Sequence, residues 1–193
     1  MLSEAKTSTN APEGFQYRND FVTDEDEAGL AKEIAQLEFS LFEMRGAVAR
    51  RRVAFFGKSY SAGGPPPPPM PPFLMPLRTA VAQWAGMDPD AFVMALINEY
   101  VPGAPIGWHR DAPQYGIVAG VSLLSRCRMK FRPYVRSHRG GSAAGHRRIA
   151  TYEVTLERRS AYLMTRDSRN SYEHHIPAVK SLRYSITFRT ARS

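Results

Sequence analysis

The sequence predicts a mostly β, α+β domain in which two N-terminal helices pack on one outer face of an antiparallel sandwich or barrel. Two amphipathic stretches occur within the first ninety residues, and at least six short β-rich runs separated by turns follow between Ala91 and Thr190. At 193 residues the chain suits one hydrophobic core better than two. Its hydrophobic and charged fractions, 43% and 23%, are typical of a soluble globular protein.

The chain begins with a polar, proline-bearing lead, residues 1–14, which we expect to be disordered. A single domain then covers 15–193, with the helices in 15–90 and the β core in 91–190. Thr23 is a candidate N-cap, and the acids that follow it favour the start of a helix. Four apolar residues at spacings of four, three and four predict one face of that helix: Leu30, Ile34, Leu37 and Leu41.

The segment between the two helices is first basic and aromatic, then rich in proline. Residues 46–60 combine β-branched and aromatic residues with three arginines, which predicts a strand pair or a strand and a loop. The prolines of 64–72 predict an extended surface connection, more often a stiff spacer than a ligand for a proline-binding module. A second helix should begin near Pro76, present Leu77, Val81 and Trp84 on one side, and end at Gly86.

Charge and cysteine content narrow the class of protein. The formal net charge is +8, and a basic surface attracts phosphate polyanions, so nucleic acid is a natural partner; an arginine-rich, merely solvated surface explains the charge equally well. The first fifteen residues lack an apolar region and no run of eighteen apolar residues occurs, so we expect neither secretion nor a membrane span. The single cysteine, Cys127, excludes an intrachain disulfide and fits a cytoplasmic location.

A His-x-Asp pair and a distant histidine form the candidate metal site. Residues two apart in a strand share a face, so His109 and Asp111 can both reach one ion. His174 follows about 65 residues later, beside His175, on what we expect to be a loop entering a strand. Two imidazoles and one carboxylate are the facial triad of non-haem Fe(II) oxygenases, which leaves coordination positions open. The alternative is a surface pair, because His-x-Asp alone is common.

The last β-rich run places polar residues on one face and apolar residues on the other. Arg183, Ser185, Thr187 and Arg189 share the polar face. Iron with two imidazoles and one carboxylate retains positive charge and chelates a 2-oxo acid, and a guanidinium binds a second carboxylate at the far end of that acid. The co-substrate so described is 2-oxoglutarate. The alternative is that both arginines form ion pairs on a solvated edge.

A series of motifs from about Ala91 to Thr190 resembles the AlkB family of iron(II)- and 2-oxoglutarate-dependent dioxygenases. These are Asn98-Glu99-Tyr100, His109-Arg110-Asp111, Tyr172-Glu173-His174-His175-Ile176-Pro177 and the closing RYSITFRT segment. The resemblance implies a double-stranded β-helix, a jelly roll with the metal between its sheets. It also implies that the iron ligands are His109, Asp111 and His174, with His175 a neighbour. The 2-oxoglutarate residues it implies are Asn98, Tyr100, Arg183, Ser185, Thr187 and Arg189.

By the same resemblance, the expected reaction is oxidative dealkylation of nucleobases in DNA or RNA with Fe(II), 2-oxoglutarate and O2, as in DNA repair. A base in a duplex must be flipped into the pocket and stacked on side chains there. Candidate substrate contacts fall in the basic segment and near the metal ligands: Arg51, Arg52, Phe56, Tyr60, Trp108, Gln114 and Tyr115.

Two other hypotheses about the function remain open. Asp111 is followed by Ala112, Pro113 and Gln114, where several DNA-repair members carry an acid, so no particular base is implied. The same chemistry on a protein or small-molecule substrate is one alternative. A non-catalytic module that only binds nucleic acid is the other. We take a monomer as the default state.

Overall fold

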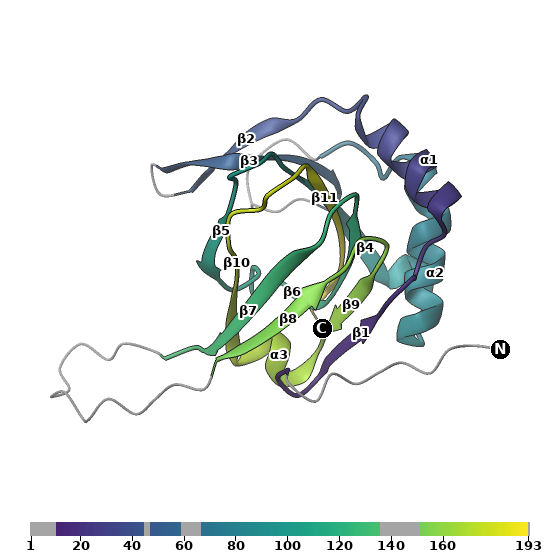
Figure 1. Ribbon diagram of the computed structural model, residues 1–193. Helices are drawn as coiled ribbons and strands as arrows, with labels where there is room; N and C mark the ends of the chain where they lie inside the picture. Colours follow the sequence, from purple (N-terminus) through teal and green to yellow (C-terminus); the bar gives the residue numbers. More distant parts are fainter. Residues whose placement is uncertain (1–10, 45–46, 59–66, 136–150, 193) are drawn as a thin grey trace, which may run out of the picture.

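Two antiparallel sheets face each other in the computed structural model, which describes residues 11–44, 47–58, 67–135 and 151–192 (Figure 1). The larger sheet has the order β1 (Phe15–Arg18), β9 (Ala161–Met164), β6 (Tyr115–Leu123), β11 (Arg183–Ala191), β4 (Phe92–Tyr100), β3 (Ala47–Gly57) and β2 (Ser40–Met44). The smaller sheet has the order β5 (Ile106–His109), β10 (Tyr172–Ile176), β7 (Cys127–Pro133) and β8 (Tyr152–Leu156). The mostly β, jelly-roll fold is confirmed.

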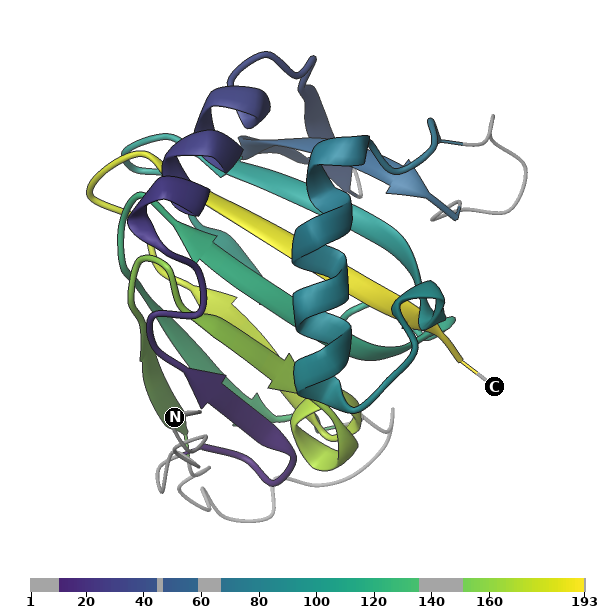
Figure 2. The same ribbon diagram turned by 90° about the vertical axis from the view of Figure 1, so that its right-hand side faces the viewer.

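The helices α1 (Asp24–Ile34) and α2 (Met75–Ala85) lie on the outer face of the larger sheet, as the sequence predicts (Figure 2). The Thr23 side chain caps α1 through the backbone N–H of Asp26 at 3.0 Å, and the Asp26 carboxylate accepts from Thr23 in return. Helix α2 ends at Gly86, whose φ of 66° is the left-handed conformation that favours glycine. Apolar residues of both helices form one core with the sheet beneath them.

The first helix is shorter than the apolar spacing predicts. It ends at Ile34, Leu37 lies in the turn that follows, and Leu41 belongs to β2 with 60% of its surface exposed. Leu41 pairs with Arg52 of β3 at the edge of the sheet. Strand pairing therefore outweighs the helical spacing that predicted Leu41 on the buried face of the helix. The predicted strand at 46–60 is confirmed as β3, with β2 as its partner.

Two residues of the expected N-terminal lead, Glu13 and Gly14, are hydrogen-bonded to the rest of the domain. The backbone carbonyl of Glu13 accepts a hydrogen bond from the Ser168 N–H at 2.8 Å, and β1 pairs along its length with β9. Gly14 has a φ of 83°, and a Cβ there would lie 2.4 Å from the carbonyl oxygen of Thr165, so only glycine fits. Residues 1–10, residues 59–66 with the first part of the proline-rich connection, and the basic segment 136–150 lie outside the described residues.

The six predicted β-rich runs form strands, and β11 lies at the centre of the larger sheet between β6 and β4. Its alternation is as predicted. Tyr184, Ile186 and Phe188 pack in the helix-side core, while the polar face lies towards the smaller sheet. The structure adds two short strands, β5 and β10, and these carry the histidines. No helix in the described part of the chain is long and apolar enough to cross a membrane.

Candidate active site

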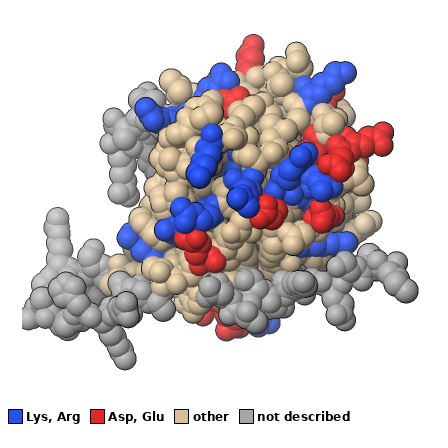
Figure 3. Space-filling view, viewed as in Figure 1, with Lys and Arg blue, Asp and Glu red and all other residues tan. Residues whose placement is uncertain are grey.

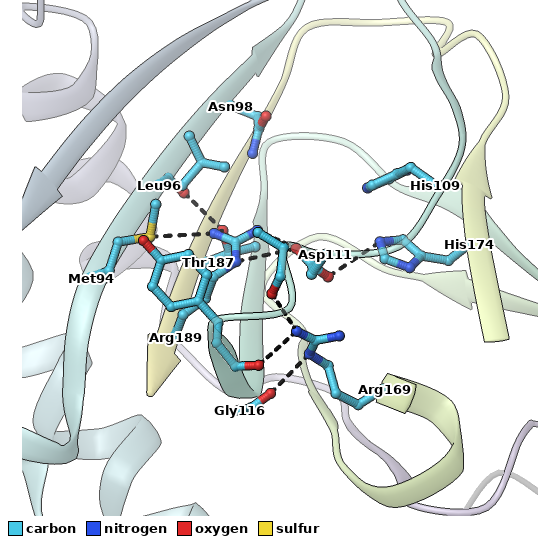
Figure 4. A network of polar contacts seen from close by, with 12 residues as sticks. Met94, Leu96, Asn98, His109, Asp111, Gly116, Arg169, His174, Thr187 and Arg189 are labelled. Atoms are coloured by element: carbon cyan, nitrogen blue, oxygen red, sulfur yellow. Dashed lines mark hydrogen bonds and ion pairs between the residues drawn. The ribbon is translucent and has the colours of Figure 1, made fainter. Parts of the chain in front are cut away.

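The two predicted histidine ligands lie opposite each other on neighbouring strands. Strands β5 and β10 pair so that His109 faces His174, with ring centroids 4.2 Å apart. The sequence predicted that His174 lies on a loop. The structure places it inside strand β10, because residues 172–175 also pair with β7. Asp111 lies two residues beyond the end of β5, and its Oδ2 is 3.7 Å from His174 Nε2 (Figure 4).

The contacts of the two adjacent histidines differ: His174 lies beside Asp111, whereas His175 contacts β5 on its own. The His175 Nδ1 lies 2.6 Å from the carbonyl oxygen of Ile106, and its ring stacks near Trp108 at 5.1 Å. His175 thus lies outside the group formed by His109, Asp111 and His174. The His109 Nδ1 is 2.8 Å from the carbonyl oxygen of Gly107. Because a carbonyl only accepts, Nδ1 carries the proton and Nε2 keeps the lone pair that a metal ligand needs.

Burial sets the charge of these three groups. It lowers the pKa of His174 to about 3 and also lowers the pKa of His109, so both imidazoles are neutral at pH 7. Burial alone would raise the pKa of Asp111, but the positive charge of Arg189 and then the two histidines outweigh it, and the net pKa lies well below the usual range. Neutral imidazoles and an ionised carboxylate are the forms that bind a divalent metal.

The two oxygens of the Asp111 carboxylate differ: Oδ1 binds an arginine, and Oδ2 has no hydrogen-bond partner. Arg189 donates to Oδ1 from Nε at 3.1 Å and from Nη2 at 2.6 Å. As the side chains stand, no group of three His, Cys, Asp or Glu among the described residues is closed around a metal position. However, Asp111 Oδ2 is buried without a hydrogen-bond partner and faces His174. A buried anionic oxygen with no donor is costly, and a cation beside it removes that cost, so the three residues fit an iron ion.

Arg183 fits the far carboxylate of 2-oxoglutarate. The side chain is fully buried, its Nε donates to Ser122 Oγ at 3.0 Å, and both terminal nitrogens lack a hydrogen-bond partner. Its guanidinium lies 5.2 Å from the ring centroid of Tyr100, which lines the cavity described next, whereas Arg183 itself does not. The two terminal nitrogens of this buried guanidinium can bind the two oxygens of a carboxylate in a bidentate arrangement.

A cavity of about 720 Å³ opens beside these groups, a volume typical of small-molecule sites. Eight of the nine residues predicted for the metal and 2-oxoglutarate line it: Asn98, Tyr100, His109, Asp111, His174, Ser185, Thr187 and Arg189. The ninth is Arg183. The structure therefore brings together segments that lie up to ninety residues apart in the chain.

The predicted substrate residues of the basic segment lie on two different faces of strand β3. Arg51 lines the cavity and its Nε donates to Asn98 Oδ1 at 3.1 Å. Arg52 is wrong as a cavity residue, because it lies on the helix side and pairs with Glu99. Phe56 is also wrong, since it is buried in the helix-side core. Phe55, which belongs to the same basic segment but was not chosen as a substrate contact, lines the cavity instead, and the alternation from Arg51 would have indicated it.

The other candidate substrate residues are also separated by the structure. Trp108 lines the cavity, with the Arg132 guanidinium 4.5 Å from its ring centroid. Gln114 is exposed and does not line the cavity. The structure therefore does not support Gln114 as a residue whose amide contacts the substrate. Tyr115 is fully buried among apolar residues and does not line it either. Tyr60 lies outside the described residues.

Three further cavity residues were missed in the sequence: Arg50, Arg110 and Tyr134. Arg110 lies between the ligands His109 and Asp111 in sequence, and its guanidinium is 3.7 Å from the centroid of the Tyr134 ring. Tyr134 lies just beyond β7 and nothing in the sequence links it to the ligands, so only the folded chain brings it there.

Comparison with known proteins gives the family of this chain. The family model described as the 2OG-Fe(II) oxygenase superfamily matches residues 23–189, and the chain belongs to this superfamily. It is therefore a dioxygenase that depends on Fe(II), 2-oxoglutarate and O2. Membership of an enzyme superfamily sets aside the alternative of a non-catalytic binding module.

Two solved structures are similar to this fold. One is described as the structure of OsALKBH1, with a TM-score of 0.67 and 14% identity over 93% of this chain and 99% of that chain. The other is a Pseudomonas putida prolyl-4-hydroxylase, with a TM-score of 0.60 and 13% identity over 93% of this chain and 94% of that chain. Both likenesses confirm the jelly-roll fold expected from the sequence, and the family model confirms the expected class of Fe(II)- and 2-oxoglutarate-dependent oxygenase.

Proposed function

We propose that this dioxygenase oxidatively dealkylates nucleobases in nucleic acid and releases succinate, carbon dioxide and formaldehyde. The observation that carries the proposal is the lining of the cavity beside the metal ligands. Three arginines line the cavity: Arg50 and Arg51 from β3, and Arg110 from the turn after β5. Three aromatic residues line it as well, namely Phe55, Trp108 and Tyr134. Guanidinium groups bind phosphate and aromatic rings stack on bases, so this lining suits a nucleotide.

The residues of the site have separate tasks. His109, Asp111 and His174 would hold the iron, which with 2-oxoglutarate and O2 supplies the oxidising chemistry. Arg183 would hold the far carboxylate of 2-oxoglutarate, and Arg189 keeps Asp111 ionised and oriented. The apolar side chains of Val118, Met129 and Ile176 also line the cavity and exclude water from its inner part. Arg51 holds the Asn98 amide through its oxygen, which leaves the amide nitrogen to donate to a ligand.

The outer surface supports the proposal less than the cavity does. In Figure 3, Lys and Arg side chains are interspersed with Asp and Glu. On the smaller sheet, Arg128 and Lys130 approach Glu153 at 3.4 and 3.3 Å, and Arg132 pairs with Glu173 at 2.7 Å. The net charge of +8 therefore does not form an unbroken basic patch on this face.

The experiment that tests the proposal supplies Fe(II), ascorbate and 2-oxoglutarate to the protein with methylated DNA and RNA oligonucleotides. We expect formaldehyde and succinate in equal amounts, and oligonucleotide affinity that falls steeply as salt rises. Unmethylated oligonucleotides of the same sequence are the control. Absence of methyl loss from every oligonucleotide, with succinate still formed, would reject the nucleic-acid substrate.

A second candidate function keeps the chemistry and takes a protein side chain as substrate. The observations behind it are the fold likeness to a prolyl-4-hydroxylase and the absence of an acid in the segment after Asp111. It predicts that peptides, and not oligonucleotides, increase the conversion of 2-oxoglutarate to succinate. It also predicts that oligonucleotide binding is weak and changes little with salt.

A further inference from the structure

A buried arginine outside the ligand set holds the backbone on which Asp111 sits. Asp111 lies in the turn between β5 and β6, where no sheet ladder fixes the chain. The Arg169 guanidinium donates one hydrogen bond to that turn, from Nη2 to the carbonyl of Ala112 at 2.8 Å, and two to the start of β6, from Nη2 to the carbonyl of Tyr115 at 2.7 Å and from Nε to the carbonyl of Gly116 at 2.8 Å. Figure 4 shows this guanidinium beside the Asp111 and Arg189 network.

Arg169 also belongs to the segment that carries the other ligand strand. It lies in the short helix α3 (Arg166–Asn170), which leads directly into β10 and His174. Ala112 is the residue next to Asp111. The guanidinium therefore connects the backbone beside one metal ligand to the segment five residues before another, independently of the pairing of β5 with β10.

The chemistry of the contact suits a positioning role. Arg169 is 6% exposed, and a planar guanidinium presents several N–H donors in a fixed arrangement that a lysine ammonium does not reproduce. Its acceptors are all backbone carbonyls, so the contact fixes the path of the main chain around Asp111. A charged donor to a neutral acceptor is also a strong hydrogen bond.

We propose that Arg169 is a positioning residue for the metal site, which sets the place of the Asp111 carboxylate relative to His109 and His174. This proposal rests on the superfamily membership and on the metal ligands, not on the nucleic-acid substrate. Groups that orient metal ligands commonly change metal affinity 10- to 100-fold, so we expect a loss of about that size when the guanidinium is removed.

The test measures Mn(II) affinity of the metal-free protein by electron paramagnetic resonance, together with the melting temperature, and requires no substrate. We expect Arg169→Lys and Arg169→Gln to bind Mn(II) about 10- to 100-fold more weakly, the glutamine variant more so. Both variants should have lower melting temperatures, because buried carbonyls lose a donor, but both should remain folded at the temperature of the binding assay. Arg166→Lys is the matched control on the same helix, because that side chain is exposed and pairs with Glu13 at 3.1 Å. It should change neither quantity.

Three outcomes would overturn the proposal. Mn(II) affinity could stay unchanged in both Arg169 variants, or it could fall equally in Arg166→Lys. Both Arg169 variants could also fail to fold, which would make Arg169 a determinant of folding and not of ligand position. If instead the metal affinity falls as expected while no oligonucleotide is demethylated, the proposal stands and the nucleic-acid substrate does not.

Discussion

At the scale of single residues, the site is defined by polar groups whose burial leaves them without a partner. Arg183 buries two terminal nitrogens and Asp111 buries one carboxylate oxygen with no hydrogen bond. Each such group costs free energy in the ligand-free protein, and each is complementary to a ligand of the superfamily. The sequence identified both residues from their motifs, but only the structure shows which of their atoms are unsatisfied.

Arg183→Met should raise the KM for 2-oxoglutarate about 10- to 100-fold or more, because charge-assisted hydrogen bonds contribute about 1.5–3 kcal/mol each. The ligand-free variant should unfold at an equal or higher temperature, since an unpaired buried cation is removed. Succinate formation at varied 2-oxoglutarate and a melting curve measure the two effects. Arg52→Met is the control, because Arg52 lies on the other face of the larger sheet. An unchanged KM in Arg183→Met would contradict the assignment.

His174 makes the metal-free protein sensitive to mild acid. Burial lowers its pKa to about 3, against about 6.5 for an unfolded histidine, so between these values the unfolded state binds more protons than the folded state. Stability from this group is complete above about pH 6.5 and is lost as the pH falls towards 3. Urea unfolding of the apo protein should show this decline, and His174→Gln should flatten it. His175→Gln is the control, and a parallel decline in His174→Gln would refute this origin.

At the scale of elements, strand alternation separates Arg51 from Arg52 and Phe55 from Phe56 on β3, although Arg50, which has the parity of Arg52, also lines the cavity. On β3, Arg51 and Phe55 line the cavity, whereas Arg52 and Phe56 face the helix side. The sequence alone did not settle which face of β3 is the inner one, since both faces of this strand carry arginine and aromatic residues. On β11 the choice was readable, because one face is wholly apolar apart from a tyrosine hydroxyl.

Phe55→Ala and Phe56→Ala should therefore affect different properties of the protein. Phe56→Ala removes a buried ring from the core beneath the helices and should lower the free energy of unfolding by about 3–5 kcal/mol. Phe55→Ala should cost less stability and instead weaken substrate binding, seen as a higher KM for the oligonucleotide with the KM for 2-oxoglutarate unchanged. Urea unfolding and steady-state kinetics separate the two. Equal loss of stability in both variants would show that the inner face of β3 is assigned wrongly.

At the scale of the whole molecule, the site is assembled from both sheets. His109 and His174 come from the smaller sheet, and Arg183 and Arg189 come from the larger one. A metal ion and 2-oxoglutarate that bind these groups connect the two sheets, and any ligand that binds only the folded state stabilises it.

Mn(II) and 2-oxoglutarate together should raise the melting temperature more than either alone. At ligand concentrations of one hundred times Kd, each binding step adds about 2.7 kcal/mol. Differential scanning calorimetry of the protein with each ligand, with both, and with EDTA measures the effect. His109→Ala should abolish the response to Mn(II), whereas His175→Ala should retain it. A response to Mn(II) that survives in His109→Ala would place the metal elsewhere.

The sequence by itself predicted the jelly-roll class, the two covering helices and the inward polar face of β11, and it named three candidate metal ligands and two candidate 2-oxoglutarate arginines. The helices and the polar face depend on local periodicity, and the candidate site residues depend on motifs. The tertiary structure decided the end of the first helix, the inner face of β3, and the contacts of Tyr134 and Arg169. The physical reason is that each of these depends on a contact between segments distant in sequence: a sheet-edge pairing, the packing of a strand against a core, a ring beside Arg110, and a guanidinium against the turn of Asp111.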